Sequence, residues 1–172
     1  AMKSYLAAPL TRKVQGYIYV ERTCAGHVRQ GLVGCVDLED YSYDKAASPR
    51  IRPSENTVVD RIPPRLAVRR GAPLESPHIL MLADDEEQSI IEPLAAKKGS
   101  LEQVYDIDLM LGGGNVKGWA VSDAADLDAI AGAMAKLDDA GRFAKLYGAN
   151  AQVKPFALAV GEGNHSLAPA LI

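Results

Sequence analysis

Three pairs of short apolar segments, each pair separated by turn-forming residues, predict β-hairpins. The paired segments are residues 17–20 with 28–36, 78–82 with 89–92, and 105–111 with 116–121. Ala25 and Gly26, an acidic run at 84–87, and the Gly-Gly-Gly-Asn run at 112–115 separate them. We interpret the last run as a hairpin turn and not as a phosphate loop, because strands flank it and no helix start follows.

The second half of the chain shows the apolar spacing of helices. Ser122 is placed to cap a helix whose apolar positions are 127, 130, 134 and 137. A shorter helix over 139–147 would end at Gly148, before a buried strand at 156–160. These elements predict an α+β fold, with a mixed, mostly antiparallel sheet and flanking helices, in a single domain over 1–172.

The two cysteines are not expected to form a disulfide. The predicted first turn places Cys24 beside His27 and Cys35 opposite Gly16, so the two thiols point to different partners. We expect small buried thiols in a reducing compartment. A catalytic Cys24 next to His27 is the alternative.

Composition narrows the class of protein. The 172 residues include 19 Lys and Arg against 22 Asp and Glu, a net charge of −3, which disfavours nucleic acid as a partner. The apolar runs are far shorter than a membrane span, and no leader opens the chain, so we expect a cytoplasmic protein without a membrane partner. The apolar end at 168–172 suggests a fragment of a longer protein whose flanking segments are missing.

The charges are not evenly distributed. Residues 50–70 hold six arginines against Glu55 and Asp60, a net charge of +4, whereas the predicted helix at 123–139 has a net charge of −4. Either the basic segment binds an anionic ligand, or the two segments are solvated or pair with each other.

The segment 161–166 predicts an anion site. It follows a strand and opens a helix, and its glycines allow the backbone amides to approach a phosphate closely. The candidate phosphate ligands are Gly161, Gly163, Asn164, His165 and Ser166. Glu162 would hold a metal ion or accept a proton. Because Pro169 is tolerated only near a helix start, we expect Ser166 to be the cap. A plain turn without ligand is the alternative.

The arginine-rich segment offers a second part of the site. Arg61, Arg65 and Arg69 have the spacing of one helix face, where guanidinium groups can bind phosphate oxygens. Glu55 and Asp60 would hold a metal or act as bases, or would cap and pair within the segment. Pro63 and Pro64 must lie in the first turn of such a helix, and an extended segment is the alternative.

The chain resembles a bacterial family known as domain of unknown function 1015. The resemblance rests on Gln30 to Tyr41, Ile51 to Thr57, Asp60 to Arg65, Gly71 to His78 and Val160 to Ala168. It covers nearly the whole chain and implies the central portion of a longer protein. The family has no established activity, so the resemblance implies a fold more than a function.

The glycine-histidine segment also resembles, more distantly, the phosphate-binding turn of the ParB and sulfiredoxin superfamily, which includes free-serine kinases. That turn has an arginine where Ser166 stands, so Arg52, Arg61 or Arg65 would have to supply the charge. Glu162 stands where the superfamily has aspartate, which changes the geometry for a metal.

Two functions follow as expectations. In the first, the chain is a phosphotransferase that uses a nucleotide with magnesium and acts on a small hydroxyl metabolite such as serine. His165, Glu162, Glu55 and Arg61 would be catalytic, and Arg52 and Arg65 would bind phosphate with the 161–166 segment. In the second, the same site is a nucleotide or metabolite sensor without turnover. The identity of any metal ligand is left open.

Overall fold

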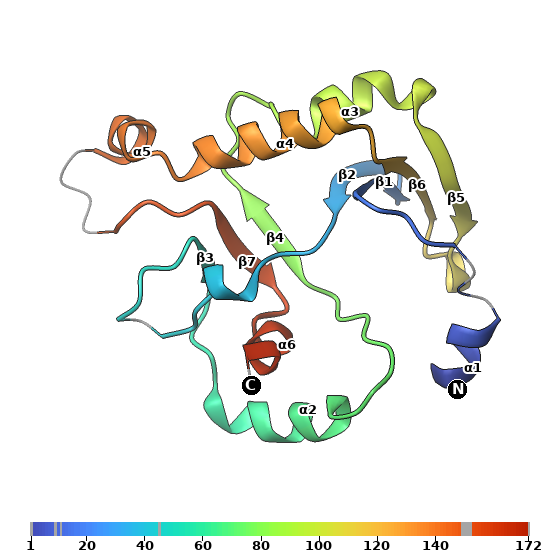
Figure 1. Cartoon of the computed structure of the whole chain (residues 1–172), viewed down its shortest axis with the longest axis horizontal. Helices are drawn as coiled ribbons and strands as arrows, with labels where there is room; N and C mark the ends of the chain where they lie inside the picture. Colours follow the sequence, from blue (N-terminus) through green and yellow to red (C-terminus); the bar gives the residue numbers. More distant parts are fainter. Residues whose placement is uncertain (1, 9, 11, 45, 149–152, 172) are drawn as a thin grey trace. The chain divides into compact units, whose positions relative to one another are not determined.

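The computed structural model describes residues 2–8, 10, 12–44, 46–148 and 153–171. These form two compact units. Unit 1 comprises Ala1–Lys13, Val36–Asp84 and Ala135–Ile172, and unit 2 comprises Val14–Cys35 and Asp85–Met134. The units are described separately below, and the single domain expected from the sequence stays a prediction. The α+β class is confirmed, since each unit combines a sheet with helices (Figure 1).

Unit 2 contains a four-stranded antiparallel sheet. The strand order is β2-β1-β6-β5. The strands are β1 (Tyr17–Cys24), β2 (His27–Val33), β5 (Glu102–Asp108) and β6 (Asn115–Val121). Two of the three expected hairpins are therefore confirmed, and their turns lie at the expected residues. The three-residue turn η4 (Met110–Gly112) occupies the glycine-rich connection between β5 and β6.

Helices α3 (Glu92–Lys97) and α4 (Ala124–Leu137) belong to the second half of the chain, with η3 (Lys98–Ser100) directly after α3. Apolar side chains of α3 and α4 pack with those of the sheet into one core, formed by Tyr19, Leu94, Trp119, Val121 and Ile130. The helix predicted from the 127, 130, 134 and 137 spacing is confirmed. Its cap is not Ser122, because Asp123 Oδ1 accepts the amide hydrogen of Ala125.

The hairpin expected between 78–82 and 89–92 is wrong. Strand β4 (Leu80–Ala83) pairs with β7 (Leu158–Glu162), and residue 92 opens α3 instead of ending a strand. The carboxylate of Asp85 accepts hydrogen bonds from the amides of Ser89 and Ile90, which closes a turn there. Pro93 lies in the first turn of α3, where a proline favours helix over strand.

Unit 1 contains a three-stranded mixed sheet in the order β3-β7-β4. Strand β3 (Ile51–Pro53) runs parallel to β7, and β4 runs antiparallel to it. The core on this sheet is formed by Tyr41, Ile51, Val160 and Leu167. The strand expected at 156–160 lies two residues later, at 158–162, and includes the first glycine of the predicted anion segment.

Helical segments complete unit 1. They are α1 (Met2–Ala7), η1 (Leu38–Asp40), η2 (Val59–Arg61), α2 (Ile62–Arg69), α5 (Ala140–Tyr147), α6 (Asn164–Leu167) and η5 (Ala168–Leu171). Helix α2 has Pro63 and Pro64 in its first turn, as the helical alternative required, and packs against η5. Helix α5 is capped by Asp139 and ends at Gly148, whose φ of 89° confirms the expected end.

The start of α6 corrects the sequence prediction. The cap is Gly163 and not Ser166, because the amides of Ser166 and Leu167 both donate to the carbonyl of Gly163. Gly163 has a φ of 91°, and a Cβ there would lie 2.6 Å from the carbonyl oxygen of His78. Only glycine fits this conformation and this space, so the helix begins immediately after it. Pro169 is accommodated because α6 ends before it and the chain continues as η5.

The cysteines are free, as expected, but exposed. Cys24 pairs with His27 across the first hairpin, which confirms the predicted register. The expectation of buried thiols is wrong. Cys24 lies at the turn end of the hairpin, where His27, Val28 and Arg29 are exposed as well, and Cys35 follows the exposed Val33 and Gly34 at the opposite end.

Candidate functional site

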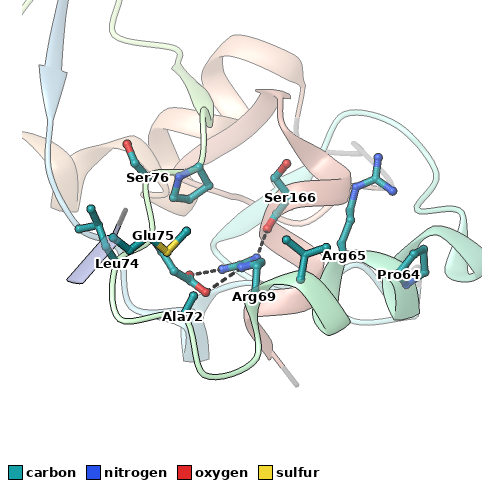
Figure 2. Close-up of a pocket in the computed structure, with 11 residues that line it drawn as sticks. Pro64, Arg65, Arg69, Ala72, Leu74, Glu75, Ser76 and Ser166 are labelled. Atoms are coloured by element: carbon teal, nitrogen blue, oxygen red, sulfur yellow. Dashed lines mark hydrogen bonds and ion pairs between the residues drawn. The ribbon is translucent and has the colours of Figure 1, made fainter. Parts of the chain in front are cut away.

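Unit 1 holds two cavities that involve the residues singled out in the sequence. The first, which we call the Arg52 cavity, has a volume of about 550 Å³. It is lined by Ser42, Tyr43, Asp44, Ala47, Pro49, Arg52, Pro53, Ser54, Glu55 and Asn56. The second, the Arg65 cavity, has a volume of about 450 Å³ and lies along α2 (Figure 2). Its walls are mostly apolar, whereas those of the Arg52 cavity are mixed.

Arg52 is half-buried and is held by carbonyls instead of by an acid. Its Nε–H donates to the carbonyl of Pro49 (3.1 Å), and Nη2 donates to that of Pro155 (3.2 Å). The guanidinium also lies 4.9 Å from the ring centre of Phe156. Burial lowers the pKa of Arg52, and among the described residues no carboxylate offsets that effect. A guanidinium has five N–H donors, and the two bonds to carbonyls engage two of the five on Arg52.

Asn164 connects α6 to the wall of the Arg52 cavity. It is 2 % exposed, and its Nδ2 donates to the carbonyl of Val160 (3.2 Å) and to the hydroxyl oxygen of Ser54 (3.3 Å). The amide of Ser54 donates in turn to the carbonyl of Val160 (3.2 Å). Because the Ser54 hydroxyl accepts from Asn164, its own hydrogen is free to donate to a ligand.

The side-chain oxygen of Asn164 is buried and has no hydrogen-bond partner among the described residues. The Val160 carbonyl fixes the orientation of the amide, since an oxygen in place of Nδ2 would face another acceptor. The hydroxyls of Tyr41 and Thr57 are also buried, and they interact with each other, which opposes the rise that burial causes in the pKa of Tyr41. An unpaired buried polar atom is costly, so the Asn164 oxygen marks a place where water or a ligand group can bind.

His165 holds the loop at 54–58 from the other side. Its Nε2 accepts the amide hydrogen of Val58 at 3.0 Å, and its Nδ1 lies 3.4 Å from Oε1 of Glu55. A nitrogen that accepts carries no proton, so in this arrangement the ring proton is on Nδ1 and faces the Glu55 carboxylate. The Glu55 side chain is 60 % exposed and that of His165 is 12 % exposed. His165 therefore contacts the loop at Val58 and at Glu55, and of the His165–Glu55 pair Glu55 is the more exposed side chain.

The glycines of the predicted anion segment serve packing and a turn. A Cβ on Gly161 would lie 3.0 Å from the side chain of Leu82, and the amide of Gly163 donates to Oε1 of Glu162. Glu162 is exposed and lines neither cavity. The amides of Asn164 and His165 have no hydrogen-bond partner within the described residues.

The predicted phosphate-binding arginines are separated. Arg52 lines one cavity, Arg65 and Ser166 line the other, and Arg61 lines neither. Arg65 donates from Nη1 to the backbone carbonyl of Arg61 (2.9 Å), the residue that precedes α2.

Arg69, near the end of α2, makes three hydrogen bonds. It binds both carboxylate oxygens of Glu75, at 2.9 and 2.5 Å, and donates to the carbonyl of Ser166 at 2.6 Å (Figure 2). Hydrogen bonding to Glu75 raises the pKa of Arg69 and lowers that of Glu75.

Ser54, Asn56 and Tyr43 were missed as site residues. The sequence carries no spacing signal for them, because they reach one cavity only through the pairing of β3 with β7 and the contacts of α6. The basic and acidic segments pair at one place: Nε of Arg50 lies 2.5 Å from Oδ2 of Asp138.

The described ranges contain no cluster of three or more His, Cys, Asp and Glu side chains arranged to hold a metal ion. The same ranges contain no helix with the length and apolarity needed to cross a bilayer.

The fold and the site define an α+β protein with a cavity of mixed polarity, which Arg52 helps to line, beside a mixed sheet. The family described as "Protein of unknown function (DUF1015)" matches residues 3–172, so the chain belongs to this family. Comparison with curated proteins gives no match, and neither does comparison with solved structures.

Proposed function

We propose that the chain is a phosphate- or nucleotide-binding domain and that the Arg52 cavity is its binding site. The observation that carries this proposal is Arg52, a half-buried guanidinium in the wall of a polar cavity with no acid partner among the described residues. An uncompensated cation removed from water is stabilised by an anion, and the guanidinium fork matches phosphate oxygens. The hydroxyl of Ser54 and the amide of Asn56 supply neutral donors in the same wall.

A carboxylate in the same cavity, that of Glu55, supports a phosphotransferase. Glu55 lines the cavity and is oriented by the Nδ1–H of His165. In the proposed reaction a ligand hydroxyl, such as that of serine, attacks the terminal phosphorus of a nucleoside triphosphate. The bond to the bridging oxygen breaks, the nucleoside diphosphate leaves, and the hydroxyl proton passes to the Glu55 carboxylate. Arg52 offsets the charge on the transferred group.

Magnesium would enter with the nucleotide. Such an ion is held by phosphates and one or two carboxylates, and Glu55 and Asp44 are the carboxylates of this cavity. The resemblance of 161–166 to the phosphate-binding turn of the ParB and sulfiredoxin superfamily would place phosphate at that turn, whereas this proposal places phosphate in the Arg52 cavity and gives the turn a positioning role. A cytoplasmic location stays a prediction.

A sensor without turnover is the second candidate. The connection of the cavity wall to α6 favours it, because Ser54 binds Asn164 while Glu55 and Val58 bind His165. A ligand that moves the loop at 54–58 would therefore also move α6.

A thermal-shift screen tests the proposal. Nucleotides, inorganic phosphate, phosphoserine and free amino acids would be tested with and without magnesium. A ligand present at 100 times its Kd stabilises the folded chain by about 2.7 kcal/mol, which gives a clear shift. We expect a phosphate-bearing ligand to raise the Tm, and Arg52→Gln to abolish that rise. If no phosphate-bearing compound changes the Tm, the proposal is wrong. Phosphate transfer to serine, measured on the same samples, separates the enzyme from the sensor.

A further inference from the structure

The Arg65 cavity combines apolar walls with an excess of positive charge. Its apolar lining comes from Met2, Pro64, Val68, Ala72, Leu74 and Pro77. The volume of about 450 Å³ lies within the range of small-molecule sites. Val68 is 79 % exposed, so its side chain offers apolar surface to a ligand. These features fit a ligand with an apolar body.

The charged groups of this cavity do not cancel. Arg69 and Glu75 form a bidentate pair, so together they contribute no net charge. Arg65 is the remaining cation in the lining, and its hydrogen bond runs to a backbone carbonyl and not to an acid. The cavity therefore has a net charge of about +1 and favours a ligand with a single negative charge.

Apolar lining lies at both ends of the cavity: Pro64 is next to Arg65 on α2, and Leu74 lies on the far side of Arg69. Figure 2 shows Arg65 on one side of Arg69 and Leu74 on the other, while Ser166 lies beside Arg69, whose guanidinium donates to its carbonyl. An elongated ligand could place its charged end at Arg65 and its apolar end near Leu74. A carboxylate suits the Arg65 end, because a guanidinium binds two carboxylate oxygens in parallel.

We propose that the Arg65 cavity is a second binding site, distinct from the Arg52 cavity, which takes a small amphipathic carboxylate with an aliphatic body. This site does not depend on the phosphate site, since the two cavities share no lining residue.

Isothermal titration calorimetry with sodium octanoate tests the proposal, with octylamine as the cation of the same length. We expect octanoate to bind and octylamine not to bind. Arg65→Gln should weaken octanoate binding by about tenfold. Arg70→Gln removes a neighbouring exposed arginine that does not line the cavity, and it should leave binding unchanged. Arg52→Gln should also leave octanoate binding unchanged, which separates this proposal from the phosphate site.

A second variant guards against an ambiguous result. Val68→Glu places a carboxylate one turn from Arg65 on an exposed position, so folding, checked by circular dichroism, should be retained and octanoate binding lost. Equal binding of octanoate and octylamine, or unchanged octanoate binding in Arg65→Gln, overturns the proposal. Arg65-dependent binding of a glutamate-rich peptide in place of octanoate would also overturn it and indicate a peptide-docking surface.

Discussion

The backbone amide of Val58 donates a hydrogen bond to Nε2 of His165 at 3.0 Å, across 107 positions of sequence. This contact, with the approach of Glu55 to Nδ1, fixes one end of the loop that forms the wall of the Arg52 cavity. That His165 binds phosphate directly stays a prediction. Its contacts in the structure are with Val58 and Glu55 of the loop, and from these we expect a positioning role.

Replacement of His165 should separate positioning from binding. His165→Ala removes the acceptor for Val58 and the partner of Glu55, and we expect a loss of about 1 kcal/mol in the free energy of unfolding. Urea denaturation measures this loss. Because Arg52 is untouched, phosphate should still bind, but phosphate transfer should fall by about 10² because Glu55 is no longer oriented. Loss of phosphate binding equal to that in Arg52→Gln would contradict the positioning role.

Gly163 should tolerate no side chain. Gly163→Ala forces a Cβ to within 2.6 Å of the His78 carbonyl oxygen at a φ of 91°, so we expect destabilisation by about 1–3 kcal/mol. Gly132 is the matched control: it lies within α4, and a Cβ there meets no atom within 4 Å. Gly132→Ala should therefore stabilise the chain by about 0.5–1 kcal/mol. Urea denaturation of both variants should give opposite signs, and the same sign for both would refute this account of Gly163.

The Arg50–Asp138 pair should contribute to the acid sensitivity of the chain. Hydrogen bonding to Arg50 lowers the pKa of Asp138 below its ordinary value of about 3.9. A lowered carboxylate pKa contributes stability above the unfolded value, and this is lost as pH falls through the folded pKa. Wild type should therefore be more stable than Asp138→Asn at pH 6, and the difference should shrink below pH 4. A difference that stays constant from pH 6 to pH 2 would rule out the pair as its cause.

Both thiols should react in the folded protein. Cys24 and Cys35 are free and exposed, so a thiol reagent such as Ellman's reagent should label both without denaturant. Cys24→Ser and Cys35→Ser should each remove one equivalent. If labelling requires denaturant, the thiols are buried, as the sequence suggested, and this prediction is wrong.

Local signals explain which parts of the fold could be predicted. The hairpin around Ala25 and Gly26 and helix α5 with its cap at Asp139 depend on neighbouring residues, and both were found. The pairing of Ile51 with Leu158 joins distant segments in parallel, and no turn signal marks such a pair. The turn at Asp85 was predicted as a hairpin loop because an acidic run is also typical of such loops. In the structure the Asp85 carboxylate accepts hydrogen bonds from the amides of Ser89 and Ile90, just before α3.

The sequence indicated some residues of the candidate site, but it did not indicate which of them lie together. Arg52 and Glu55 were singled out and do line one cavity. The involvement of Ser54 depends on a buried amide more than one hundred residues away, at Asn164, and sequence spacing does not reveal such a contact. Arg65 and Arg69 lie on a helix, as predicted, but they border a different cavity from Arg52.

The central claim is that Arg52 binds the anionic group of a ligand. Isothermal titration calorimetry of inorganic phosphate and of ATP with magnesium, on wild type, Arg52→Gln and the control Arg70→Gln, tests it most directly. We predict binding to wild type and to Arg70→Gln with the same Kd, and at least tenfold weaker binding to Arg52→Gln with an unchanged circular dichroism spectrum. Binding of equal strength to Arg52→Gln, or no binding of either ligand to wild type, would contradict the claim.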